Sequence, residues 1–80
     1  MLNITRTPGE EALVGATLVK YEYLVRGQLG KKVIISVNED KTTLIKGQAR
    51  EFKGFTLHLK DIKGKQITLG IESELKVRRL

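Results

Sequence analysis

Apolar and polar residues alternate one by one along most of the second half of this chain. Two such stretches, Phe55 to Lys60 and Gln66 to Ile71, flank the dipeptide Lys63-Gly64. Because the side chains of an extended strand point alternately to the two faces of a sheet, this pattern predicts two strands joined by a tight turn. A third alternating stretch, Leu75 to Leu80, predicts a last strand that follows a turn at Glu72-Ser73-Glu74.

The opening residues, Met1 to Thr7, predict another strand. Its residues Leu2, Ile4 and Arg6 would share one face, because they are two positions apart. Pro8-Gly9 then ends the strand, since Pro presets φ for the first central position of a type II turn and Gly accepts the positive φ of the second. A strand without a neighbour close in sequence must be paired by distant residues or by another chain.

The residues between these elements also favour strands. Stretches rich in β-branched or aromatic residues run over Ala12 to Val19, Tyr21 to Val25, Val33 to Val37 and Thr42 to Lys46. Turns are predicted at Gly27-Gln28-Leu29-Gly30 and at Asn38 to Lys41. A short helix over Asp40 to Phe52 is the alternative for the last stretch, with a cap at Asn38 and a stop at Gly54. We therefore expect an all-β fold with at most one short helix.

The size of the chain and its lack of cysteine limit how it can be stabilised. Eighty residues bury only about 60% of their unfolded surface, so a monomer would be marginally stable and association is expected. Without Cys there is no disulfide framework, and a reducing compartment suits the chain. No apolar run reaches the roughly 20 residues of a membrane span, and the order of a signal peptide is missing. We expect a soluble, cytoplasmic protein without a membrane partner.

The net charge of +6 comes entirely from the second half of the chain. Residues 1 to 40 hold five basic and five acidic side chains, whereas residues 41 to 80 hold ten basic and four acidic ones. A one-sided basic surface is typical of proteins that bind phosphate-bearing partners. A lysine-rich surface that merely keeps the protein in solution is the alternative.

Catalytic chemistry is not expected from these residues. The chain has one His, no Cys and no pair of carboxylates at a spacing that sets up acid and base roles. His58 lies among alternating Leu residues, where a half-exposed strand position is expected, and a single imidazole cannot assemble a metal site. We expect no enzyme activity, no cofactor and no small-molecule substrate.

The terminal segment Lys76-Val77-Arg78-Arg79 is the best candidate for contact with nucleic acid. In a strand its cations, Lys76, Arg78 and Arg79, would lie on both faces. A guanidinium can pair bidentately with guanine O6 and N7, which discriminates between bases by about 1–3 kcal/mol. Since only four aromatic residues are present, stacking of bases on exposed rings is not expected.

Both ends of the chain resemble the CsrA/RsmA family of carbon storage regulators. Met1 to Glu10 is similar to the opening strand and turn of that family, where an apolar start leads through Thr-Arg to a Gly-Glu turn. Ile62 to Ile71 resembles the family's central hairpin, and Leu75 to Arg79 resembles its final strand with the terminal Arg. Residues from about 17 to 53 have no counterpart in the compact members. We therefore expect a single domain of residues 1–80 that carries this insertion.

The resemblance implies a small, intertwined homodimer of antiparallel sheets, in which the first strand of one protomer lies beside the last strand of the other. In the family this edge binds mRNA or small RNA, commonly at GGA in a hairpin loop or at a ribosome-binding site. Binding represses translation or alters mRNA stability. By position, Ile4, Thr5 and Arg6 match the first-strand contacts, and Val77 and Arg79 match those of the last strand.

With Lys76 and Arg78 added, these residues form the predicted RNA-binding set. Two other functions remain open. One is a protein-interaction module that forms mixed dimers with a CsrA-type regulator. The other is a generic basic, ribosome-associated β domain, which would bind RNA without base preference.

Overall fold

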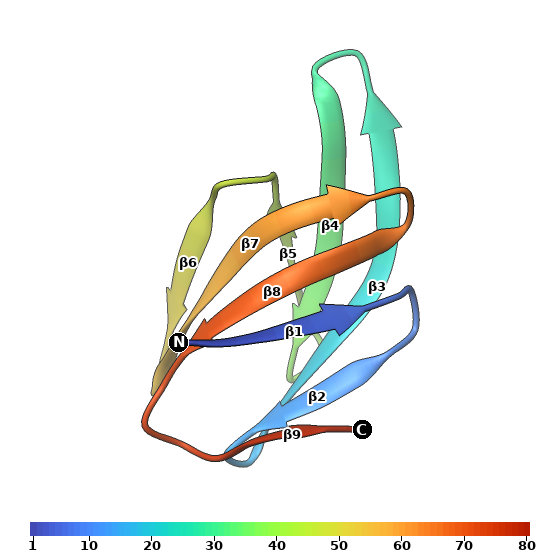
Figure 1. Cartoon of the computed structure of the whole chain (residues 1–80). Helices are drawn as coiled ribbons and strands as arrows, with labels where there is room; N and C mark the ends of the chain where they lie inside the picture. Colours follow the sequence, from blue (N-terminus) through green and yellow to red (C-terminus); the bar gives the residue numbers. More distant parts are fainter.

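The computed structural model describes all 80 residues and contains nine β-strands and no helix (Figure 1). The strands are β1 (Leu2–Arg6), β2 (Glu11–Val14), β3 (Thr17–Gly27), β4 (Gly30–Val37), β5 (Asp40–Leu44), β6 (Ala49–Phe52), β7 (Phe55–Lys63), β8 (Gln66–Glu72) and β9 (Val77–Arg79). The predicted all-β fold is confirmed. The alternative helix over Asp40 to Phe52 is wrong, because β5 and β6 occupy that segment. Accordingly, no helix is present that is long and apolar enough to cross a membrane.

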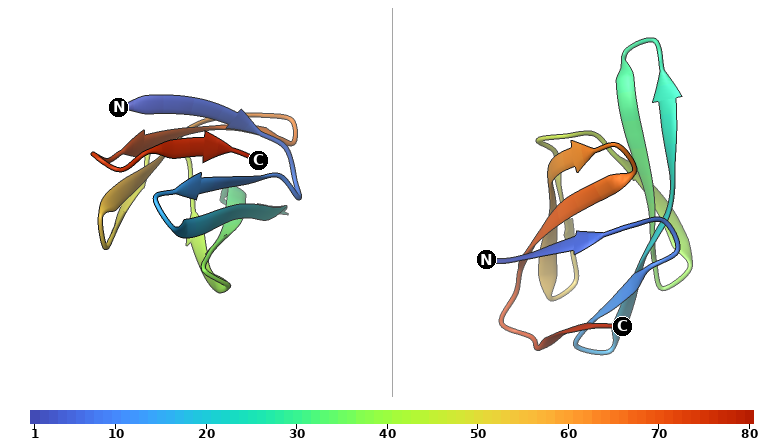
Figure 2. Two further views of the ribbon diagram at one scale, coloured as in Figure 1. Left: turned by 90° about the horizontal axis from the view of Figure 1, so that it is seen from below. Right: turned by 45° about the vertical axis from the view of Figure 1, so that its right-hand side comes forward.

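The strands form two antiparallel sheets that face each other. The four-stranded sheet has the order β1-β8-β7-β6, and the five-stranded sheet has the order β5-β4-β3-β2-β9. Most neighbours are consecutive hairpin strands, and only the β1–β8 and β2–β9 pairs join distant parts of the chain. Figure 2 shows how the two layers curve around a common interior. The first and last strands lie at the edges of different sheets.

The opening strand is paired by residues far away in the same chain, which is one of the two alternatives left open by the sequence. β1 runs antiparallel to β8, from Leu2 opposite Ile71 to Arg6 opposite Ile67. The Pro8-Gly9 turn then carries the chain from the four-stranded to the five-stranded sheet (Figure 1). The Glu10 amide donates to the Thr7 carbonyl oxygen at 3.0 Å, and Gly9 has φ of 92°, as a type II turn requires.

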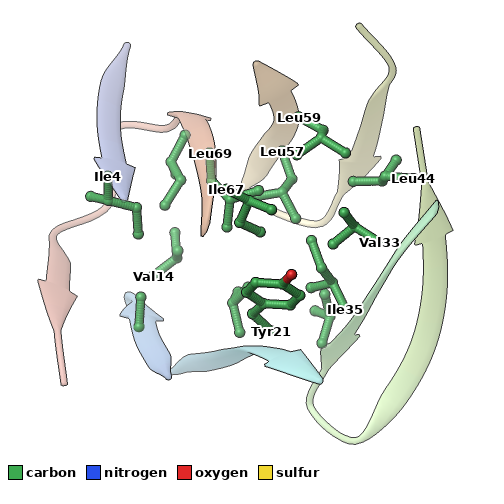
Figure 3. Close-up of a cluster of buried hydrophobic side chains, with 14 of the residues drawn as sticks. Ile4, Val14, Tyr21, Val33, Ile35, Leu44, Leu57, Leu59, Ile67 and Leu69 are labelled. Carbon is green, nitrogen blue, oxygen red and sulfur yellow. The ribbon is translucent and has the colours of Figure 1, made fainter. Parts of the chain in front are cut away.

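The core lies between the two sheets and is built from alternate residues of their strands. Figure 3 shows side chains from both layers meeting in the interior, among them Ile4, Tyr21 and Leu57. On β7 the alternation predicted from sequence is confirmed, because Phe55, Leu57 and Leu59 are buried and the residues between them are not. Burying one such side chain completely contributes about 1.5–3 kcal/mol.

Three sequence-based predictions need correction. The stretch Ala12 to Val19 is not one strand, because a turn at Gly15-Ala16 separates the end of β2 from the start of β3. Gly15 has φ of 61°, which glycine adopts without steric cost. The last strand is only three residues long, Val77–Arg79, and β6 (Ala49–Phe52) was not predicted.

The segment expected as an insertion is an integral part of both sheets. Residues 17 to 53 contain β3, β4 and β5 of the five-stranded sheet and β6 of the four-stranded sheet. The predicted turn at Asn38 is confirmed, with positive φ at Asn38 (48°) and Glu39 (74°), as in type I′ hairpin turns. The β3–β4 hairpin extends beyond the rest of the molecule (Figure 1).

Candidate nucleic-acid interface

The two strands predicted to bind RNA, β1 and β9, are both edge strands on the same side of the molecule (Figure 2). Within the chain β1 pairs only with β8, and β9 pairs only with β2. Their arrows point in the same direction in Figure 1 and in the left view of Figure 2. Each strand therefore leaves one row of main-chain N–H and C=O groups without a strand partner.

The pairing of β9 with β2 assigns its side chains to faces. Val77 lies opposite Val14, and Arg79 lies opposite Ala12. Val14 and Ala12 are buried, and directly opposite residues share a face, so Val77 and Arg79 are on the inner face of the sheet. Val77 packs against the core, whereas Arg79 is exposed because it lies at the open end of the edge strand.

Arg78 and Lys76 complete the cations of the last strand. Arg78 is paired with Leu13, which places it on the outer face, and it is exposed. Lys76 is also exposed, and its carbonyl oxygen accepts a hydrogen bond from the Gly15 amide at 2.8 Å. The predicted distribution of cations over both faces of the last strand is confirmed.

On β1 the three predicted residues have different environments. Ile4 is only 1% exposed and belongs to the core, so its side chain cannot contact RNA and only its main chain is available. Thr5 lies on the outer face and is exposed. Arg6 shares the inner face with Ile4 but lies at the end of the strand, where it is partly exposed.

The guanidinium of Arg6 is held in place by main-chain carbonyl oxygens. Its Nε donates to Thr5 at 2.7 Å, and its Nη1 donates to Glu11 at 3.1 Å and to Leu80 at 3.4 Å. The Leu80 amide in turn donates to the Glu11 carbonyl oxygen at 3.2 Å. Arg6 thus links the end of β1 to the end of β9, and its Nη2 remains without a hydrogen-bond partner.

Arg6 and Arg79 come from different sheets, and the Arg6 guanidinium contacts the carbonyl oxygen of Leu80, the residue that follows Arg79. Both are on inner faces, and both lie where the edges of β1 and β9 approach each other. The structure contains three ion pairs, and none of them involves a cation of β1 or β9. This edge therefore carries positive charge that no acidic side chain neutralises by direct contact.

The loop before β9 is anchored by Leu75, a residue that the sequence did not single out. A Cβ atom on Gly15 would lie 3.1 Å from Leu75 Cδ1, and one on Gly54 would lie 3.0 Å from the same atom. The leucine therefore packs over both turns. Ser73 adds a hydrogen bond from Oγ to the Gly54 carbonyl oxygen at 2.8 Å, so the start of β9 is tied to both sheets.

The turn after β1 places one carboxylate close to the basic edge. Glu10 accepts hydrogen bonds from the Thr7 amide at 2.7 Å and from the Thr7 hydroxyl at 2.8 Å. These bonds, with a smaller contribution from the positive charge of Arg6, hold the pKa of the Glu10 carboxyl below its usual value. Glu10 is therefore an anion fixed in the turn rather than an ion-pair partner of β9.

Two further features are a His–Glu pair and a small pocket. His58 Nε2 lies 2.9 Å from Glu72 Oε1, and this pair stands on neighbouring strands β7 and β8. No three His, Cys, Asp or Glu side chains gather in an arrangement that could hold a metal ion. A small pocket of about 240 Å³ is lined in part by the stacked rings of Phe52 and Phe55.

Comparisons with protein-family models, with curated proteins and with solved structures found no match to this chain.

Proposed function

We propose that this chain is a dimeric, sequence-specific RNA-binding regulator, whose site is formed by the edges of β1 and β9. Its targets would be GGA-type loops or ribosome-binding sites in mRNA or small RNA. Occupying such a site excludes ribosomes and other users of the same RNA segment, which represses translation or alters mRNA stability. The proposal combines the resemblance to carbon storage regulators with the geometry of the two edge strands.

The observation that carries the proposal is the convergence of Arg6 and Arg79 at one edge. A guanidinium presents N–H donors in a planar fork that matches the O6 and N7 acceptors of guanine. The bidentate pair is therefore assigned to Arg79, because Arg6 has its Nε and Nη1 bound to carbonyl oxygens and offers only Nη2, which can bind an acceptor with little loss of conformational entropy. Lys76 and Arg78 add charge beside this pair for contact with phosphates.

The free edges of β1 and β9 support the dimer. Each edge strand offers unpaired main-chain groups that a strand of a second copy can bind. Pairing of β1 with β9 of another copy would join a four-stranded sheet of one protomer to a five-stranded sheet of its partner. The resulting dimer has two equivalent RNA sites, and each protomer contributes its own Arg6 and Arg79 to one of them.

The test compares a hairpin RNA that carries GGA in its loop with a hairpin of scrambled loop sequence. We expect Arg79→Ala to weaken GGA binding by about 1–3 kcal/mol, roughly 5- to 150-fold. The matched control is Arg78→Ala, which removes the same charge from the outer face of the same strand. Arg78→Ala should weaken binding of the two hairpins to a similar extent, and by less than Arg79→Ala weakens binding of the GGA hairpin.

Equal affinity of the wild type for the two hairpins at moderate salt would overturn the sequence-specific function. Equal losses from Arg79→Ala and Arg78→Ala would reject the inner-face site but leave a basic RNA-binding surface. That second result would favour the generic ribosome-associated domain.

One observation also supports a protein-interaction module as a second candidate. The two free edges could accept strands of a conventional CsrA-type regulator and give mixed dimers. Mixing the two purified proteins and measuring mass by native mass spectrometry distinguishes these functions. Mixed dimers, together with no RNA affinity of this chain alone, would favour the interaction module.

A further inference from the structure

The β3–β4 hairpin is a protruding arm whose outer part, beyond the Lys20–Glu22 ion pair, holds positive charge and no acidic residue. Its ladder runs from Val19 opposite Val37 to Gly27 opposite Gly30, and its tip carries the fully exposed Leu29 (Figure 1). Between Tyr23 and Val37 the chain contains Arg26, Lys31 and Lys32 but no Asp or Glu. The outer part of the arm is therefore basic, although residues 1 to 40 as a whole have no net charge.

Two of these cations are directly opposite each other. Arg26 is paired with Lys31, and the next pair on the same face is Leu24 with Val33. Val33 is buried and Leu24 packs against the core, so Arg26 and Lys31 continue the inner face of the sheet. Like charges at directly opposite positions destabilise a sheet. Neither residue has an ion-pair partner that would offset this cost.

The β7–β8 turn brings further cations to the same side. The phenolic hydroxyl of Tyr21 on β3 donates to the Lys65 carbonyl oxygen at 2.8 Å, which fixes this turn against the base of the arm. The turn carries Lys63 and Lys65, both exposed and neither in an ion pair. In the right view of Figure 2 the turn lies beside the arm.

The turn also lies close to the β1 edge. Arg6 is opposite Ile67 in the β1–β8 ladder, and Ile67 is only two residues from Lys65. Cations therefore follow one another from Arg6, across the β7–β8 turn, to the inner face of the arm. A row of cations of this kind suits contact with several successive phosphates of one nucleic acid.

We propose that Arg26, Lys31, Lys63 and Lys65 form a second surface that binds the sugar-phosphate backbone of an RNA stem. This inference rests on the proposed function, since the stem is the one that carries the loop bound at β1 and β9. Phosphates would supply the negative charge that the opposed pair Arg26 and Lys31 lacks in the protein. Contacts of this kind add affinity without reading the bases.

The experiment uses GGA hairpins that differ only in stem length, one short and one at least twice as long. The wild type should bind the long-stem hairpin more tightly, and each phosphate contact should contribute roughly three- to eightfold near 0.1 M salt. Lys31→Ala should reduce this gain by the share of one phosphate contact and lower the logarithmic salt slope by roughly 0.7–0.9. Binding of the short-stem hairpin should stay unchanged.

Lys32→Ala is the matched control. Lys32 lies on the same arm, one residue away, but pairs with Val25 on the opposite face. It should keep the preference for the long stem. Thermal unfolding of both variants checks folding, and Lys31→Ala should not be destabilised, because it removes a repulsive pair.

Three results would overturn this inference. The first is equal binding of the two stem lengths by the wild type. The second is an equal loss of affinity for the long-stem hairpin in Lys31→Ala and Lys32→Ala. The third is binding of the wild type, but not of Lys31→Ala, to anionic phosphatidylserine vesicles with no stem-length effect, which would assign the arm to a membrane surface. Hairpins with scrambled loops distinguish this inference from the proposed function. If the wild type shows no preference for GGA but still binds the long stem more tightly, only the β1–β9 site is rejected.

Discussion

Arg6 in the first strand donates a hydrogen bond through Nη1 to the carbonyl oxygen of Leu80, at 3.4 Å. The two residues lie at opposite ends of the chain, since Arg6 ends β1 of the four-stranded sheet and Leu80 follows β9 of the five-stranded sheet. Through the same guanidinium the end of β1 is bound to Glu11 at 3.1 Å. Arg6 therefore has two roles, since it ties the edge strands together and supplies donors to the proposed RNA site.

Arg6→Ala should release the end of β9. Losing one net hydrogen bond costs about 1 kcal/mol, so amide exchange at Leu80 and Arg79 should accelerate roughly fivefold. Arg6→Lys should not restore protection, because an ammonium on a flexible stem cannot reproduce the fork of donors. Hydrogen exchange by NMR measures this effect, and β4 amides serve as the internal control. Unchanged exchange at Leu80 would mean that Arg6 does not hold the terminus.

Glu10 should make the β1–β2 turn sensitive to acid. Its pKa is lowered in the folded state, so its contribution to stability is present above the unfolded pKa, about 4.3, and is lost as pH falls through the folded pKa. Glu10→Gln should make the free energy of unfolding fall less steeply as pH decreases from about 5 to about 2. Urea unfolding at several pH values provides the measurement. An acid limb identical to that of the wild type would contradict this assignment.

Tyr21→Phe should loosen the β7–β8 turn, because it removes the hydrogen bond to the Lys65 carbonyl oxygen. We expect a loss of about 1–2 kcal/mol in the free energy of unfolding. Burial raises the pKa of the Tyr21 hydroxyl, so the wild type should also lose stability as pH rises above about 10, and the variant should lose less. Tyr23→Phe is the control, since Tyr23 is exposed and has no such hydrogen bond.

The proposed pairing of free edges predicts a concentration-dependent dimer. Sedimentation should give a mass that approaches twice that of the 9.0 kDa chain as concentration rises. Association through β1 and β9 should protect amides of both strands in parallel with the increase in mass. A monomer at all concentrations would reject the dimer but would leave the edge of Arg6 and Arg79 within one chain intact.

The sequence predicted most strands because alternation directly reflects burial. β7 and β8 were found from the alternating run that begins at Phe55, and β1 from Leu2, Ile4 and Arg6. The turn at Gly15-Ala16 was missed because the residues on both sides are apolar, so no change in pattern marks it. β6 was missed because Ala49, Arg50 and Glu51 are exposed at a sheet edge, and their composition suits a helix equally well.

The candidate site was predicted less completely. The alternation placed Ile4 and Arg6 on the same face, but only the pairing with β8 shows that this face is the core and that Ile4 is buried. The inner-face position of Arg79 depends on β2, which no local pattern connects to β9. The opposed pair Arg26 and Lys31 was hidden by the balanced charge of the first half. Long-range pairing decides the positions of Ile4 and Arg79, and neighbouring residues do not encode it, whereas Arg26 and Lys31 flank a local turn.

The topology also has a kinetic consequence. The β2 to β5 and β6 to β8 segments consist of consecutive hairpins, whereas the β1–β8 and β2–β9 ladders each close loops of most of the chain. Closing long loops costs more entropy, so these two ladders should form last during folding and open first in the native state. They are the ladders that position Arg6 and Arg79. A ligand that bridges the two ladders would therefore slow local unfolding of both chain ends at once. Its affinity would fall when either terminus is destabilised.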